Sequence, residues 1–150
     1  MYGDSDVMRR RADHLREQAV DLRALADQLV AQTEGIGWTG RAADSMRERV
    51  RERATHLRAA AAQHDTAADS LDRHVQKVDA IKDAIVDRER KASTLVADAR
   101  TRVARIDAAN EAEADPAVRR VPDADDQTLA AFTPPPSGHK DWLAVSLPGL

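Results

Sequence analysis

The chain has 150 residues, enough for one domain; 33% of them are charged, and the formal net charge is −3. Acidic and basic residues are intermixed, so no basic stripe is available for a phosphate backbone, and nucleic-acid binding is not expected. The chain contains no cysteine, which excludes disulfides and thiol chemistry, and no run of about 18 apolar residues, which argues against membrane insertion.

The first predicted element is an amphipathic helix over residues 5–33. Apolar side chains recur in it every seven residues, and alanines follow four positions after the first three of them. The two rows are Met8, Leu15, Leu22 and Leu29, and Ala12, Ala19 and Ala26. Residues at these spacings share one face of a helix, so they predict a single apolar stripe in which Leu15, Leu22 and Leu29 are interface residues.

The segment Gly35-Ile36-Gly37-Trp38-Thr39-Gly40 follows and predicts a hairpin turn over residues 34–40. Gly35 is expected to end the first helix with a positive φ, which glycine reaches without a Cβ clash, and Thr39 to cap the second helix. Trp38 is expected to fill the open end of the two-helix core.

A second helix is predicted over residues 41–112, because no glycine or proline occurs between Gly40 and Pro116. Ten residues in it share one heptad position, and nine of them are apolar. They are Ala43, Val50, Leu57, His64, Leu71, Val78, Ile85, Ala92, Ala99 and Ile106. The row predicts a long helix that packs against a partner, with Leu57, Leu71, Val78, Ile85 and Ile106 in the interface.

The fold predicted for residues 1–114 is an all-α antiparallel helical hairpin. Folded back from the turn, the first helix reaches only to about residue 70, which leaves the row from Leu71 to Ile106 uncovered. Two solutions are open: the helix breaks near residues 87–91 and a third helix folds back, or a second chain covers the row. We favour a continuous helix and association with another hairpin, because the charged run at 87–91 contains no glycine or proline.

Residues 115–150 are predicted to form a Pro-rich, extended and mobile tail, since Pro116, Pro122 and the prolines at 134–136 cannot continue a helix. Its last stretch is more apolar and contains Trp142 and Leu143. Three interpretations are open for these two residues: a short docking motif, packing onto the protein's own helices, or disorder.

The sequence predicts no catalytic residue, metal or cofactor, and hence no enzyme. The five histidines lack the i, i+4 spacing of a helical zinc site, and no phosphate loop or nucleophile elbow is present. His64 and His74 lie on or beside the apolar row, where partly exposed histidines are ordinary; the other interpretation is that their protonation at mildly acidic pH weakens association.

The Trp38-Thr39-Gly40 turn, about 40 residues into the chain and between two amphipathic helices, resembles the WXG family of proteins exported by type VII (ESX) secretion systems. Trp38 and Gly40 match the family motif, and the resemblance covers roughly residues 5–85. It implies a hairpin that pairs with itself or a sister hairpin as a four-helix bundle. It further implies synthesis in the cytoplasm, export as a folded dimer, and a larger secreted substrate or the secretion ATPase as further partners.

One feature departs from the family pattern. Many such substrates carry a Tyr-x-x-x-Asp/Glu signal after the second helix, whereas the only tyrosine here is Tyr2, whose match to that pattern we attribute to chance. The export signal could therefore reside on a partner, or the chain could remain cytoplasmic as an adaptor. A generic coiled-coil scaffold unrelated to secretion is the alternative function. A membrane-surface protein is disfavoured, because interfacial helices carry bulkier apolar faces.

Overall fold

The computed structural model describes residues 5–150, so Tyr2 lies outside the described residues. Within that range the chain is all-α and contains no strand, which confirms the predicted fold class. The elements are α1 (Ser5–Glu34), α2 (Arg41–Ala112), the 3₁₀ helix η1 (Pro116–Val118), α3 (Ala124–Ala130) and the 3₁₀ helix η2 (Lys140–Ala144).

The chain divides into two compact units, of which the first ends at Asp79 and the second is Ala80–Leu150. We call the described residues 5–79 the N-terminal unit and residues 80–150 the C-terminal unit. Helix α2 contributes to both. The predicted boundary after residue 114 is therefore wrong, because the second half of α2 packs with the residues that follow it in sequence.

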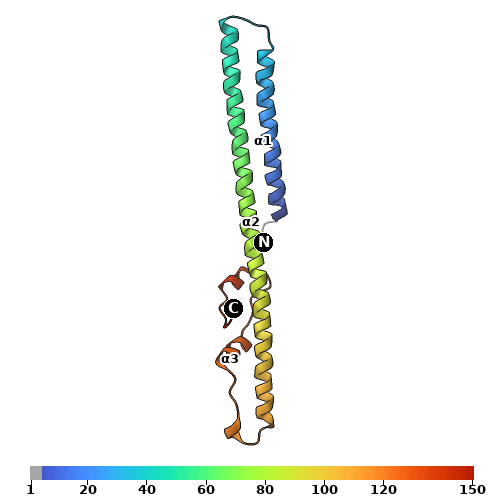
Figure 1. Ribbon diagram of the computed structural model, residues 1–150, viewed down its shortest axis with the longest axis vertical. Helices are drawn as coiled ribbons and strands as arrows, with labels where there is room; N and C mark the ends of the chain where they lie inside the picture. The colour runs from blue at the N-terminus through green and yellow to red at the C-terminus, as the bar shows by residue number, and fades with distance from the viewer. Residues whose placement is uncertain (1–4) are drawn as a thin grey trace. The chain divides into compact units, whose positions relative to one another are not determined.

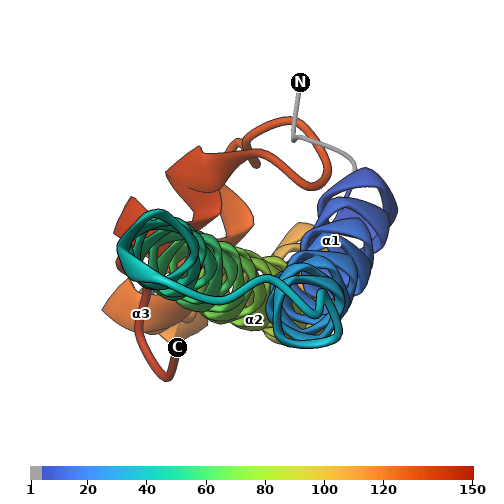
Figure 2. The ribbon, with the colours of Figure 1, turned by 90° about the horizontal axis from the view of Figure 1, so that it is seen from above.

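In the N-terminal unit, α1 runs antiparallel to the first half of α2, as predicted (Figures 1 and 2). The fully buried side chains of this hairpin are mostly alanines: Ala12, Ala19 and Ala26 of α1, and Ala54, Ala61 and Ala68 of α2. The leucines of the hairpin are half-buried, apart from Leu25, which is exposed. Alanine side chains let two helix backbones approach closely, so the alanine rows, rather than the predicted leucine rows, form the centre of the seam.

Ion pairs between α1 and α2 lie along one side of the alanine seam. They are Arg9–Asp79, Arg16–Asp72, Arg23–Asp65, Arg58–Asp27 and Arg51–Glu34, and the last four have N···O distances of 2.6, 2.5, 2.6 and 3.1 Å. The arginine belongs to α1 in the first three pairs and to α2 in the last two. A shift of the helices by one heptad would bring like charges together near this crossover, so the ladder favours one register.

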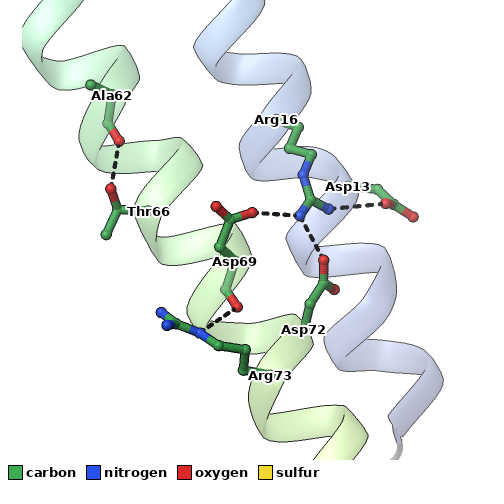
Figure 3. A network of polar contacts seen from close by, with 7 residues as sticks. All are labelled: Asp13, Arg16, Ala62, Thr66, Asp69, Asp72 and Arg73. Atoms are coloured by element: carbon green, nitrogen blue, oxygen red, sulfur yellow. Dashed lines mark hydrogen bonds and ion pairs between the residues drawn. The ribbon is translucent and has the colours of Figure 1, made fainter.

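Arg16 shows how these contacts are built. Its guanidinium reaches two carboxylates one helical turn apart on α2, Asp72 at 2.6 Å and Asp69 at 2.9 Å (Figure 3). Hydrogen bonds from Arg16 to Asp72 and Asp69 raise the pKa of the guanidinium. One arginine thereby fixes two successive turns of the opposite helix.

The turn differs from its prediction at three residues. Gly40 has φ +101° and its carbonyl accepts the Asp44 N–H at 3.1 Å, so Gly40, and not Thr39, directly precedes the first residue of α2. Gly35 does not have a positive φ; its N–H continues the helical pattern by donating to Ala31. Trp38 is 62% exposed and does not fill the end of the hairpin core.

Helix α1 also extends further along α2 than predicted. Ser5 and Arg9, at its start, contact Asp79 rather than residues near position 70. The segment 35–40 is not helical and runs beside the first turns of α2, where Arg47 binds its carbonyls. Because this segment takes up the start of α2, α1 pairs with residues further along the helix.

In the C-terminal unit, α2 continues without interruption through residues 87–91, as we favoured. The row it carries is nevertheless covered by the chain's own C-terminal residues (Figure 1). Trp142, which is 3% exposed, packs with Ile85 and Ala92, and Leu129 packs with Val96 and Ala99. The predictions of a mobile tail and of an uncovered row are thus wrong for these residues, because the apolar groups among the prolines bury themselves on α2.

Arginines of α2 hold the tail by its backbone. Arg88 donates to the carbonyls of Trp142 (3.0 Å) and Val145 (2.5 Å), and Arg100 donates to those of Ala130 and Phe132, both at 3.2 Å. The carbonyls of Val145, Ala130 and Phe132 lie outside regular helix or at its end and so need donors, whereas that of Trp142 also accepts the Val145 N–H. The prolines and short helices therefore lie in defined places along α2.

An ion pair adds to this contact. Arg102 donates to both carboxylate oxygens of Asp126 in α3, at 2.8 and 2.5 Å. The hydrogen bonds lower the pKa of Asp126 and raise that of Arg102, because each charge stabilises the other. The pair fixes α3 against the second half of α2.

Candidate protein-interaction surface

Half-buried apolar residues follow one side of the N-terminal hairpin. They are Met8, Leu15, Leu22 and Leu29 of α1, and Val50, Leu57, His64, Leu71 and Val78 of α2, where His64 is the polar exception. We call this set the leucine face. It contains six predicted interface residues, Leu15, Leu22, Leu29, Leu57, Leu71 and Val78, and the hairpin brings them together.

Helical geometry places the leucine face opposite the ion-pair ladder. At about 100° per residue, the leucines lie roughly 50° to one side of the buried alanines, and the ladder residues roughly 50–100° to the other. The two helices are antiparallel and face each other through alanine, so their leucine rows fall on the same side. One side of the hairpin therefore carries partly exposed ion pairs, and the other carries apolar side chains that α1 and α2 cover only in part.

The leucine face has a hollow of about 280 Å³ near its middle, lined by Gln18, Asp21, Leu22, Leu25 and His64. The His64 Nδ1 atom is buried and has no hydrogen-bond partner within the part of the chain that the structure describes. A buried nitrogen without a partner is unfavourable. His64 therefore lines the hollow with a ring whose Nδ1 atom is itself covered by the chain.

The tip of the hairpin carries a second exposed apolar group made of Ile36, Trp38 and Met46. Arg47 holds the backbone below it by donating to the carbonyls of Trp38 at 2.5 Å and Ile36 at 3.3 Å. Its guanidinium also pairs with Asp44 at 3.1 Å. The Trp38 ring is therefore presented outward by a segment whose carbonyls are fixed.

The other predicted site residues belong to the C-terminal unit. Ile85 is buried beneath the tail and Ile106 is half-buried, so only the first is closed to another chain. Trp142 packs on the protein's own helix, which selects the second of its three interpretations, whereas Leu143 is 44% exposed.

The sequence did not predict that three arginines bind loop and tail carbonyls: Arg47 at the turn, and Arg88 and Arg100 at the tail. Each is one of many arginines on a charged helix, and a bond to a carbonyl in a distant loop leaves no periodic pattern. The polar break at His64 in an otherwise apolar row was the one visible signal for the hollow.

Over residues 5–150, none of the helices combines the length and the apolar character that crossing a membrane requires. Comparisons of the chain with family models, with curated proteins and with solved structures give no match.

Proposed function

We propose that this chain is a type VII secretion-associated helical hairpin protein, either a substrate or a co-secreted partner or adaptor. It acts by helix–helix binding and carries out no catalysis. The partner is a second hairpin, its own copy or a sister protein, which covers the leucine face to complete a four-helix bundle. A larger secreted substrate or the secretion ATPase would then engage the pair.

The observation that carries the proposal is the turn. A Trp-x-Gly segment joins two antiparallel helices, Gly40 adopts a positive φ there, and Trp38 points its apolar ring into solvent while Arg47 fixes the backbone. An exposed tryptophan on a fixed segment is suited to recognition, because aromatic side chains bury a large area at low entropic cost. This supports a receptor contact at Trp38 rather than a structural role.

The leucine face supports the binding mode. Its leucines and valines remain half-buried, while partly exposed ion pairs connect the two helices on the opposite side of the same hairpin. A partner that covers these residues removes from water the apolar surface that α1 and α2 leave exposed. This burial stabilises the complex by about 25 cal/mol per Å² of apolar surface. A second hairpin presents a matching apolar stripe of the same length.

An export assay tests the proposal. The tagged full chain is expressed in a bacterium that carries a type VII system, with any sister hairpin encoded beside it, and is followed in the medium with the secretion ATPase active or inactivated. We expect export that depends on the ATPase. Retention in the cells under both conditions, with stable helical association, would instead favour the cytoplasmic scaffold or adaptor.

Trp38→Ala separates recognition from folding. Because the ring is 62% exposed, we expect an unchanged melting temperature together with loss of export. Val20→Ala is the matched control, since Val20 on α1 is 63% exposed and lies away from the turn. Equal export of the two variants would remove Trp38 from the proposed receptor contact.

A further inference from the structure

A cavity of about 420 Å³ lies in the C-terminal unit, between one side of α2 and the tail segment 131–139 that joins α3 to η2. We call it the tail cavity. Its walls are mostly apolar and include Ala92, Val96 and Ala97 of α2, and Phe132, Pro134 and Trp142 of the tail. A cavity of this size, with apolar and aromatic walls and a few polar groups, is typical of a small-molecule site.

The tail segment over the cavity is tied to α2 at both ends. At one end Arg100 donates to two tail carbonyls, and at the other the Glu89 carboxylate accepts the Gly138 N–H at 3.1 Å. Between these ties, three consecutive prolines restrict the backbone, and the Trp142 indole donates to the Pro136 carbonyl at 3.1 Å. The segment is therefore stiff and held in place, so the cavity is formed before a ligand arrives.

The charge around the tail cavity favours an anion. Between residues 88 and 105, α2 has six basic side chains and two acidic ones, Glu89 and Asp98. Glu89 and Arg100 both line the cavity, but Glu89 already accepts a tail N–H. Arg100 uses its Nε and one terminal nitrogen for carbonyls, and no carboxylate within residues 5–150 pairs with it. Because a guanidinium has five N–H donors, Arg100 retains donors for an acid.

We propose that the tail cavity binds a small amphipathic monocarboxylate, with the carboxylate on Arg100 and the apolar body against Phe132 and Trp142. Glu89 and Arg100 are eleven residues apart on α2, about 16 Å along the axis, so an extended alkyl chain can lie between them. Ala97 lines the cavity and is exposed, which gives a ligand a way in from solvent. The site uses neither the leucine face nor Trp38, so it stands or falls separately from the proposed function.

Three ligands with the same alkyl chain and different head groups test the site. Trp142 is the only tryptophan in a Trp38→Phe chain, so its fluorescence reports the cavity wall directly. The full chain is titrated with octanoate, octanol and octylammonium at neutral pH. We expect a saturable change with octanoate, about tenfold tighter than with octanol, and the weakest binding with octylammonium. The absence of a saturable response to all three overturns the site, and equal affinity for octanoate and octanol overturns the assignment of a carboxylate.

Ala97→Leu tests the location. The larger side chain fills part of the cavity from an exposed position, so we expect octanoate to bind at least tenfold more weakly, while hydrogen exchange in residues 124–150 remains slow. Ala104→Leu makes the same change at another exposed position of α2, outside the cavity, and should bind octanoate like its parent. Unweakened binding to Ala97→Leu would place the ligand elsewhere and overturn the proposal.

Arg100→Gln tests the charge. Glutamine can still donate to a tail carbonyl but carries no charge, so we expect octanoate affinity to fall about tenfold, to that of octanol, while octanol binding is unchanged. A merely structural role for Arg100 would weaken both ligands alike. Arg105→Gln removes an exposed arginine of α2 that does not line the cavity, and it should keep the preference for octanoate. A preference for octanoate that survives Arg100→Gln would show that Arg100 does not bind the acid.

Discussion

The two halves of α2 carry the same heptad series but bury it in different ways. In the N-terminal unit, Leu57 and Leu71 of that series stay half-buried, because α1 packs on the alanine row beside them. In the C-terminal unit, Ile85 and Ala92 of the same series are buried by the tail. A helical partner matches a row of small side chains, whereas a tail with aromatic residues can fill the space above a mixed row of isoleucine and alanine.

The two units therefore differ in their need for a partner. Only the N-terminal unit presents a long apolar row that the described chain leaves partly open. In the C-terminal unit the tail of the same chain covers the row, at least at Ile85 and Ala99. The first prediction tests that internal cover.

Trp142→Ala should have the largest effect. Trp142 is 3% exposed, packs with Ile85 and Ala92, and lies with its ring centroid 6.2 Å from that of Phe132. Truncating a buried tryptophan costs about 3–5 kcal/mol, which should weaken tail docking without unfolding the hairpin. Hydrogen exchange should quicken in residues 124–150 and remain slow at the alanine seam.

The control for that variant is Leu143→Ala, one residue further on and 44% exposed. It should leave exchange in the tail nearly unchanged. If both variants behaved alike, burial of Trp142 would not be what holds the tail, and the arginine contacts to the tail carbonyls would become the main cause.

Ala61→Leu tests the alanine seam of the N-terminal unit. Ala61 is fully buried, so the added atoms force the helices apart, and overpacking of this kind costs about 1–3 kcal/mol. Ala62→Leu, the exposed neighbour on the same helix, has the same change in helix propensity and should be nearly neutral in thermal unfolding. A seam that tolerated Ala61→Leu would contradict close contact through alanine.

The sequence predicted the helices well because their periodicity is local. The bounds predicted for α1 and for the uninterrupted α2 agree with the structure to within one residue. The row at the seam centre was misjudged, since hydrophobicity favours leucine as a contact residue, whereas close antiparallel approach favours alanine. Trp38 was misjudged likewise: its size suggested a core role, but Arg47 holds the turn backbone and leaves the ring outside.

The tail was the least predictable part. Its prolines correctly exclude a long helix, yet they do not prevent Leu129 and Trp142 from packing on α2. That docking depends on contacts between residues 30 to 57 positions apart, such as those of Arg88 and Arg100 with tail carbonyls. Such pairs follow no repeat, so composition favoured mobility where the fold provides a defined path.

Gly40→Ala tests the turn that opens α2. Gly40 has φ +101°, and a Cβ there adds strain of about 1–2 kcal/mol, although no atom lies within 4 Å of the added carbon. Gly37→Ala is the matched control, because Gly37 has open space and no positive φ. We expect Gly40→Ala to lower the melting temperature of the N-terminal unit and Gly37→Ala to leave it unchanged or slightly raised. Equal melting temperatures would mean that the turn readily relaxes.

Asp126→Asn should have the smallest effect, confined to the C-terminal unit. Arg102 lowers the pKa of Asp126 in the folded chain, so the folded state binds this proton less readily than the unfolded chain. The contribution is complete above the ordinary aspartate pKa of about 3.9 and is lost as the pH falls through the lower folded pKa. Trp142 fluorescence, recorded in a Trp38→Phe background, reports tail docking.

We therefore expect Asp126→Asn to weaken docking slightly at neutral pH and to match its parent once the pH is below the folded pKa. Asp125→Asn removes the same charge from the first turn of α3 at an exposed residue and serves as the control. If Asp125→Asn had the same pH dependence, the effect would come from the charge at the start of α3 and not from Arg102. A difference limited to Asp126 would assign the tail's acid sensitivity to its pair with Arg102.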